Sequence, residues 1–145
     1  MTEDLKVGNL KMRKQSGINF NPIIGQVVTE INRMYPIIHL NNGHLTIECP
    51  WRLRDGNKII VGRAETEIED KKEKAFLDFE GVLFNRRITQ VYHYDDISDL
   101  TIIFEGDKFL ELFHDSSWYE GWTLQGPGNF LVVSTPGGGF SYWEM

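Results

Sequence analysis

Apolar and polar positions alternate in short segments along most of the chain, a pattern typical of half-buried β-strands. From about residue 23 onward these segments are rich in β-branched and aromatic residues, which favour strands. Turns containing Asp55-Gly56 and Gly106-Asp107 separate some of them. In chain order the segments are IIGQVVTEI, PIIHL, GHLTIEC, KIIVGRAE, RRITQVYHY, DLTIIF, FLELFHD, TLQG, NFLVVST and FSYWEM. The pattern predicts a mainly β fold.

The strongest local signal is the stretch IIHLNNGHLTIEC, where Asn42-Gly43 stands between two alternating runs. An Asn-Gly pair favours a two-residue hairpin turn, because both central residues need a positive φ. This turn would place Leu40 opposite Leu45 and Ile38 opposite Ile47. One face, expected in the core, then carries Ile38, Leu40, Leu45, Ile47 and Cys49. The other face carries His39, Asn41, His44, Thr46 and Glu48.

Residues 66–84 differ from the rest, because helix-forming residues dominate and acidic residues precede basic ones. This composition predicts one helix at about residues 69–80, with Gly81 ending it. Just before the helix, the alternation places Glu65 and Glu67 on one face of a strand.

The two halves of the chain resemble each other. Residues 23–63 and 84–145 each contain a strand ending in [IV]-T-[EQ]-[IV], a spacer, a hairpin with a glycine turn, and a tryptophan after it. In this comparison Trp51 corresponds to Trp118. We expect one β-rich domain over residues 18–145, made of two related β-meanders. They would form a sandwich or a partly open barrel, with the helix covering one face or end.

The chain has 145 residues, of which 41% are hydrophobic and 25% charged, as in an ordinary soluble domain. Residues 1–17 show no periodicity and are expected to form a flexible N-terminal arm. They lack the apolar segment of a secretory signal, and no apolar run reaches the length of a membrane span. Cys49 is the single cysteine, so no internal disulfide can form. We therefore expect a cytoplasmic protein.

The net charge of −6 is unevenly distributed. Residues 1–63 carry 9 Lys/Arg and 5 Asp/Glu, whereas residues 95–145 carry 1 and 9. Nucleic-acid binding requires clustered basic residues, so this distribution disfavours it. An acidic C-terminal half suits a basic partner, although acidity can also serve solubility alone.

Three stretches contain residue types used in catalysis. Residues 114–117, HDSS, have the members of a hydrolase triad, but such members rarely adjoin in sequence, and no Gly-x-Ser-x-Gly elbow is present. Glu65 and Glu67 could act as paired carboxylates, or could belong to a solvated edge or to a helix N-terminus stabilised by the macrodipole. Residues 137–139, GGG, follow a proline without a nearby lysine and predict a turn instead of a phosphate loop. We predict no catalytic residues.

Two further groups could bind small ligands. His39, His44 and Cys49 have metal-ligating side chains, but the predicted hairpin points Cys49 to the opposite face. We therefore predict no metal site and no cofactor. Arg52 and Arg54 share a strand face, where they could bind an anion or pair with the acidic C-terminal half. Internal pairing is the favoured interpretation.

Acidic and aromatic residues interleave most densely between residues 92 and 122. Aromatic side chains bury area in an interface, while carboxylates select and steer a basic partner. The predicted partner-binding residues are Asp95, Asp96, Asp99, Glu111, Asp115, Trp118, Tyr119 and Glu120.

Three motifs carry a resemblance: PWRL at residues 50–53, YEGWTL at 119–124, and PGG at 136–138 before Trp143. Over roughly residues 23–143 the chain resembles a family of small uncharacterised bacterial proteins with these motifs. The resemblance implies a β-rich fold of two related halves. Some similar small proteins look like immunity proteins encoded beside interbacterial toxins, and the resemblance implies no catalytic residues.

The sequence thus favours an immunity protein, not an enzyme, that neutralises a cognate toxin domain of basic character, most simply a nuclease. The alternative is a β-sandwich module that binds a small ligand through Trp118, Tyr119, Trp122 and the Arg52/Arg54 pair. A hydrolase using His114 or the Glu65/Glu67 pair is the third hypothesis.

Overall fold

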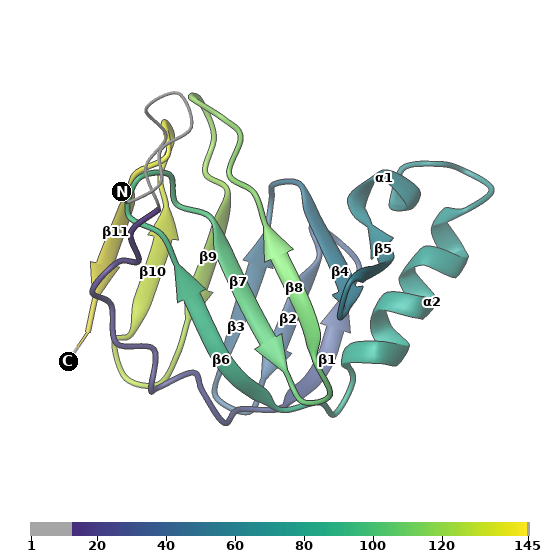
Figure 1. Cartoon of the computed structure of the whole chain (residues 1–145), viewed down its shortest axis with the longest axis horizontal. Helices are drawn as coiled ribbons and strands as arrows, with labels where there is room; N and C mark the ends of the chain where they lie inside the picture. Colours follow the sequence, from purple (N-terminus) through teal and green to yellow (C-terminus); the bar gives the residue numbers. More distant parts are fainter. Residues whose placement is uncertain (1–12, 145) are drawn as a thin grey trace, which may run out of the picture.

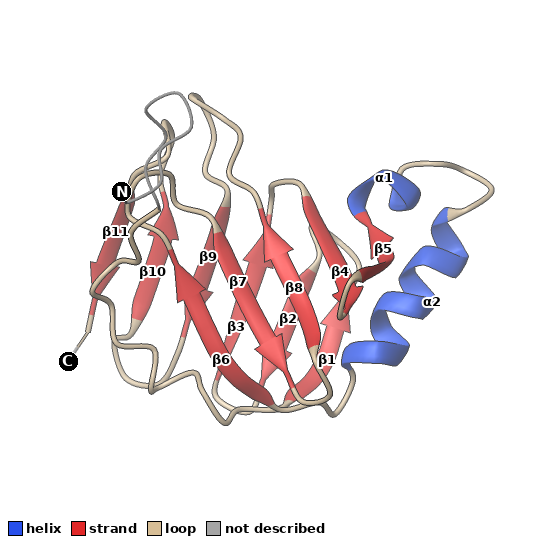
Figure 2. Ribbon diagram, in the orientation of Figure 1, coloured by secondary structure: helices blue, strands red, loops and turns tan. Residues whose placement is uncertain are grey.

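The computed structural model describes residues 13–144 and shows a sandwich of two antiparallel sheets (Figures 1 and 2). The six-stranded sheet contains, in spatial order, β1 (Val28–Asn32), β2 (Ile37–Leu40), β3 (Gly43–Ile47), β9 (Trp122–Gln125), β10 (Leu131–Ser134) and β11 (Phe140–Trp143). The five-stranded sheet contains β5 (Lys58–Gly62), β4 (Trp51–Asp55), β8 (Lys108–Leu112), β7 (Leu100–Phe104) and β6 (Ile88–His93). The predicted mainly β sandwich is confirmed.

The strand pairing repeats between the two halves of the chain. Strands β1–β3 form a meander in one sheet, and β6–β8 form a meander in the other. Each meander begins with a β-bulge, at Val28/Glu30 and at Ile88/Gln90. After its meander the chain crosses to the opposite sheet, so β4 pairs with β8 and β9 pairs with β3. Each half therefore completes the sheet of the other.

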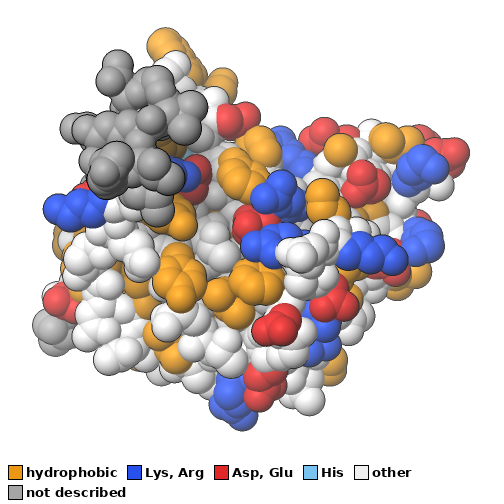
Figure 3. Space-filling view, viewed as in Figure 1, with side chains coloured by type: hydrophobic (Ala, Val, Ile, Leu, Met, Phe, Trp, Pro, Cys, Tyr) orange, Lys and Arg blue, Asp and Glu red, His pale blue; other side chains and the backbone are white. Residues whose placement is uncertain are grey.

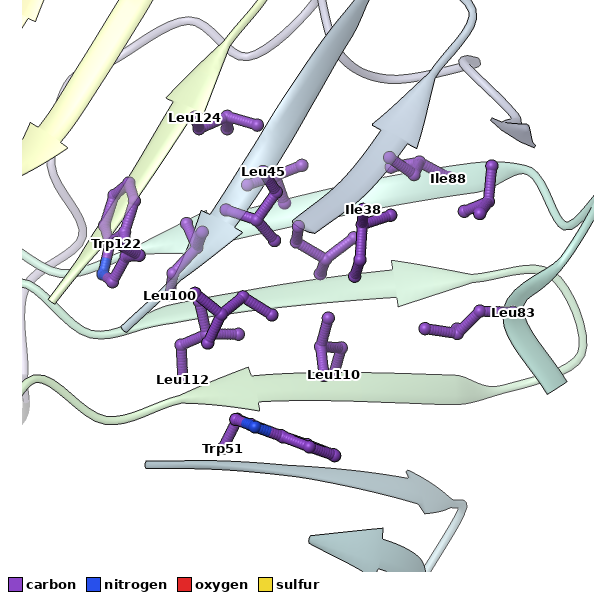
Figure 4. Close-up of a cluster of buried hydrophobic side chains, with 14 of the residues drawn as sticks. Ile38, Leu45, Trp51, Leu83, Ile88, Leu100, Leu110, Leu112, Trp122 and Leu124 are labelled. Atoms are coloured by element: carbon purple, nitrogen blue, oxygen red, sulfur yellow. The ribbon is translucent and has the colours of Figure 1, made fainter. Parts of the chain in front are cut away.

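A buried tryptophan begins the strand after each crossing. Trp51 opens β4 opposite Leu112, and Trp122 opens β9 opposite Ile47. Both indoles are buried and point between the sheets (Figure 4). The counterpart of Trp51 is therefore Trp122, and the expected correspondence with Trp118 is wrong. In the sequence Trp51 and Trp118 looked equivalent because each follows a hairpin. The packing shows that Trp122 is buried and Trp118 is exposed.

The first hairpin differs from the prediction in its register. Ile38 pairs with Leu45 and His39 with His44, so Asn41 and Asn42 form the turn. Gly43 instead lies inside β3, where a Cβ atom would come within 2.1 Å of the Gln125 carbonyl oxygen. The glycine thus permits the close approach of β9 and does not form the turn. Because the shift is two residues, the predicted core face is unchanged and all five of its residues are buried.

The helical region also departs from the prediction. Arg63–Thr66 form a short helix, α1, and Lys72–Leu83 form α2, whose end lies beyond Gly81. Buried Leu83 and Phe79 hold this last turn against the core, which outweighs the local preference of glycine to end a helix. Glu65 therefore does not share a strand face with Glu67. Its carboxylate accepts a hydrogen bond from the Gly62 backbone N–H at 2.7 Å at the start of α1.

Both helices lie at one end of the sandwich, beside the β5 edge (Figure 2). Arg33, in the turn after β1, links the six-stranded sheet to α2. Its guanidinium bonds to Glu80 at 2.7 Å and to Glu73 at 2.8 Å. Within residues 13–144 no helix is long and apolar enough to cross a membrane.

The described part of the predicted arm, residues 13–17, lies along β6. The Ser16 backbone N–H donates to the His93 carbonyl at 2.7 Å, and Gln15 forms a bridge with Tyr94. Residues 1–12 lie outside the described residues.

His93 is a polar residue within the core. Its Nδ1 lies 2.7 Å from the Ser16 hydroxyl, and its Nε2 lies 2.7 Å from the Ser98 hydroxyl. The imidazole and the Trp122 indole form a T-shaped pair, with ring centres 5.4 Å apart. Burial lowers the pKa of His93 to about 4 from its usual 6.5, although nearby Asp95 acts in the opposite direction. The imidazole is therefore neutral in the folded protein at neutral pH.

We expect acid to destabilise the protein through His93. The His93 imidazole binds a proton more tightly in the unfolded chain than in the folded protein. The stabilisation that comes from burying the neutral imidazole is therefore complete above about pH 6.5 and declines as the pH falls toward 4. The free energy of unfolding, measured by urea denaturation, should fall by about 2 kcal/mol between pH 7.5 and pH 5, where carboxylates remain ionised.

The control is the His93→Gln variant, whose stability should vary less with pH over this range. If the variant does not fold, NMR titration of the His93 ring in the parent protein measures the same quantity. An imidazole that protonates in the folded state near pH 6.5 would contradict the prediction.

Candidate functional site

The two crossings between the sheets differ in length. The first uses three residues, 48–50, between β3 and β4, whereas the second uses nine, 113–121, between β8 and β9. Residues 113–121, here called the crossing loop, contain Trp118 and Tyr119, whose side chains are 77% and 69% exposed. The fold makes the equivalent connection with three residues, so the crossing loop is longer than the connection requires.

Hydrogen bonds hold the crossing loop in one conformation. The Ser116 hydroxyl accepts the backbone N–H groups of Trp118 at 3.0 Å and Tyr119 at 2.8 Å. The Ser116 carbonyl accepts the N–H of Gly137 at 2.9 Å, from the turn between β10 and β11. At the start of the loop, Asp99 accepts the His114 N–H at 2.8 Å. The exposed aromatic rings therefore project from an ordered backbone.

The end of the loop packs tightly against its beginning. The Gly121 carbonyl accepts the Glu48 N–H at 2.8 Å, and its own N–H donates to Ser134 at 3.1 Å. A Cβ atom on Gly121 would lie 2.1 Å from Nδ1 of His114. Only glycine fits at this position, where the loop folds over the buried imidazole.

The crossing loop forms one wall of a depression of about 770 Å³. The lining residues are Glu48, Arg63, Asp115, Ser116, Trp118, Tyr119, Glu120 and Pro136. Figure 3 shows hydrophobic side chains protruding at the top of the view, where Figure 1 shows the connection between β8 and β9. The depression combines two exposed aromatic rings with three carboxylates.

The carboxylates of the depression are not neutralised by the described chain. Within residues 13–144, no hydrogen bond or ion pair reaches the side chains of Glu48, Asp115 or Glu120. The guanidinium of Arg63, the basic residue of the lining, is 3.2 Å from the Glu67 carboxylate. The electrostatic potential in the depression is therefore negative and attracts cations.

Four of the eight predicted partner-binding residues meet at this depression: Asp115, Trp118, Tyr119 and Glu120. Glu48, Arg63 and Pro136 were not predicted to belong to it. They come from separate segments, and tertiary contacts to the crossing loop, such as the hydrogen bonds from Glu48 N–H to Gly121 and from Gly137 N–H to Ser116, bring these segments together. No local sequence pattern marks them.

The remaining predicted acids lie elsewhere, and two of them share Arg13. The guanidinium of Arg13 contacts the carboxylates of Asp96 at 2.9 Å and Asp99 at 3.1 Å, and lies over the Tyr94 ring. The hydrogen bond from Arg13 lowers the pKa of Asp96. Asp95 is exposed beside this cluster, and no ion pair to its carboxylate forms within residues 13–144.

Glu111 is held between Arg52 and Arg54 on the outer face of the five-stranded sheet. Its carboxylate is 2.6 Å from Arg52 and 2.8 Å from Arg54, and its side chain is 13% exposed. Partial burial acts to raise the pKa of Glu111, but hydrogen bonds from both arginines outweigh burial and lower it. Internal pairing of the arginines with the acidic half is confirmed. Figure 3 shows acidic, basic and hydrophobic side chains interspersed on this face.

Among the other chemical candidates Ser116 lines the depression, whereas His114, Glu65, Glu67 and residues 137–139 are absent from its lining. The His114 ring is buried, and its two nitrogens form no hydrogen bond with any described residue. Ser116 is engaged by the loop backbone, Glu67 pairs with Arg63, and residues 137–139 form a turn as predicted. Trp122 belongs to the core, where its Nε1–H donates to the Ser98 carbonyl at 2.9 Å.

Metal-ligating residues are similarly dispersed, and no group of three lies together within residues 13–144. Cys49 is buried, and burial raises the pKa of its thiol to about 12. The thiolate needed for metal binding or nucleophilic attack is therefore disfavoured.

No curated protein and no solved structure matches the chain. A family described as a family of unknown function (DUF6188) matches residues 19–144, which include both sheets, both helices and every residue that lines the depression. The chain belongs to this family.

Proposed function

We propose that this protein is an immunity protein, which binds the cognate toxin domain of an interbacterial system and covers its active or substrate-binding surface. The toxin domain would be basic, and a nuclease is the simplest class with that character. The observation that carries the proposal is the crossing loop, which exposes two aromatic side chains beside three carboxylates that have no ion pair within residues 13–144.

The aromatic residues supply the affinity in this proposal. Trp118 and Tyr119 are large, and their exposure leaves most of their apolar area available for burial by a partner. Tryptophan and tyrosine are enriched among the residues that dominate binding energy. Since the loop backbone is already ordered by Ser116, little conformational entropy is lost when a partner binds.

The carboxylates supply attraction and selectivity. Glu48, Asp115 and Glu120 surround the aromatic pair, so a basic surface is drawn to the depression and an acidic one is repelled. The net charge of −6 extends this preference over the whole molecule. The cytoplasm, where a producing cell needs protection from a nuclease, is the proposed location.

A small-ligand-binding module is the second candidate, favoured by the volume of the depression. About 770 Å³ lies within the size range of small-molecule sites. However, two of the elements expected for such a site lie elsewhere, because Trp122 is in the core and Arg52 is bound to Glu111. The lining is also strongly charged, whereas small-ligand sites are mostly apolar.

The direct test is calorimetry with the C-terminal domain encoded by the gene directly upstream, in a catalytically inactivated form. Nanomolar, strongly salt-dependent binding would support the immunity function. Absence of binding between two folded proteins, together with a thermal shift caused by a metabolite, would favour the small-ligand module instead.

We expect the triple variant Glu48→Gln, Asp115→Asn, Glu120→Gln to associate with the toxin domain about tenfold more slowly at low salt, because steering is lost. Stopped-flow measurement at two ionic strengths gives the rate. The matched control makes the same amide substitutions at Glu30, Asp70 and Asp107, three exposed acids outside the depression that have no ion pair within residues 13–144. Equal slowing in both variants would show that net charge alone matters, which contradicts a local role.

Trp118→Ala and Tyr119→Ala should each weaken binding 10- to 100-fold, about 1.4–2.8 kcal/mol, mainly through faster dissociation. Their free energies of unfolding should stay within about 0.5 kcal/mol of the parent, because both side chains are exposed. Trp143→Ala, at an exposed tryptophan of β11, is the control and should bind normally. Unchanged affinity in both loop variants would place the interface elsewhere.

A further inference from the structure

The outer face of the six-stranded sheet carries two histidines directly opposite each other. His39 of β2 pairs in register with His44 of β3, and the two ring centres are 6.3 Å apart. Both side chains are partly exposed, whereas the alternating residues Ile38 and Leu45 are buried. The two imidazoles therefore stand side by side on a surface that solvent reaches.

The surroundings leave both rings free to bind. Within residues 13–144, no hydrogen bond or ion pair reaches the side chain of His39 or His44. Their neighbours across the sheet are Glu30, opposite His39, and Gln125, opposite His44. The adjacent cross-strand row has no charged residue; it contains Asn32, Ile37, Thr46, Thr123, Val133 and Ser141. Glu30 is thus the charged neighbour of the histidine pair in these two rows.

We propose that the His39–His44 pair binds a divalent transition-metal ion such as Zn²⁺, Ni²⁺ or Cu²⁺, with water completing the coordination. Neutral imidazole is the side chain that these borderline ions favour. Glu30 provides a carboxylate next to His39, where it can orient the imidazole or reach the ion through water. The site is separate from the depression, since none of these residues lines it.

The observed spacing suits a shared ion after a small adjustment. Two nitrogens each about 2.1 Å from one ion stand about 3.4 Å apart in a tetrahedral arrangement, and their ring centres roughly 5–6 Å apart. The ring centres of His39 and His44 must therefore approach by up to about 1 Å from 6.3 Å. Rotation about the side-chain bonds supplies this movement, because neither ring is enclosed by the core.

The other two histidines cannot provide such a site. Both nitrogens of His93 are occupied by serine hydroxyls inside the core. His114 is buried, at 7% exposure, beneath Gly121. The protein has four histidines in all, so metal binding by imidazole is assigned to one pair and can be tested cleanly.

The test is calorimetric titration of the chelator-treated full chain with Zn²⁺ and separately with Ni²⁺, with the imidazole signals followed by NMR. We expect saturable binding of one ion per chain, with shifts at His39 and His44 and none at His93 or His114. The single variants His39→Asn and His44→Asn should each weaken binding at least tenfold. Both positions are on the surface, so we expect these variants to remain folded.

The charge-neutralising triple variant of the depression is the control, and it should bind the ion as tightly as the parent. Binding of one ion per two chains, with the same imidazole shifts, would support the site and show that a second copy completes the coordination. No saturation up to about 1 mM ion would overturn the proposal. Binding that persists in both histidine variants would also overturn it.

Discussion

The structure depends on the exchange of strands between its two sheets. Each half of the chain builds a three-stranded meander and then sends its next strand to pair with the meander of the other half. Trp51 and Trp122 lie at these two crossings and fill the space between the sheets (Figure 4). Neither half is complete alone, because the third strand of its meander would keep an unpaired edge and the apolar face of the meander would lack the opposite sheet. Folding of the domain is therefore expected to be cooperative across both halves.

This constraint distinguishes the residues that hold the two sheets together from those that are candidates for function. The first crossing connects two strands in opposite sheets with three residues, whereas the second crossing has six additional residues. They are ordered by specific hydrogen bonds and expose Trp118 and Tyr119. Exposing two adjacent large aromatics favours aggregation and brings no folding stability, a cost that the proposed recognition of a partner would offset.

The sequence predicted the faces of the strands better than their registers. Period-two alternation identifies which side chains are buried, and a register shift of two leaves that result unchanged, as in the β2–β3 hairpin. The predicted register was wrong because Gly43 allows close approach of Gln125 on β9 and does not form the turn. Since β9 lies about 80 positions away, the local sequence does not predict this contact. The end of α2 was missed for the same reason, since burial of Leu83 outweighs the propensity of Gly81.

The candidate site was predicted in part because aromatic and acidic residues cluster in the crossing loop itself. Its other wall came from Glu48 and Arg63, which depend on tertiary contacts. The pairing of His39 with His44 likewise required the true register, because the expected one placed them diagonally.

Acidic residues that look equivalent in the sequence have different physical roles in the structure. Glu111 is neutralised by two arginines and Asp96 by Arg13, so their charges contribute mainly to internal cohesion. Asp115 and Glu120 have no such partner within residues 13–144, and their charges extend into solvent. An interface that buried Glu111 would gain little attraction, because its field is already cancelled locally. One that covered Asp115 and Glu120 would instead pair charges that no described residue neutralises. The distribution of arginines, more than that of the acids, therefore determines which part of the acidic half can attract a basic partner.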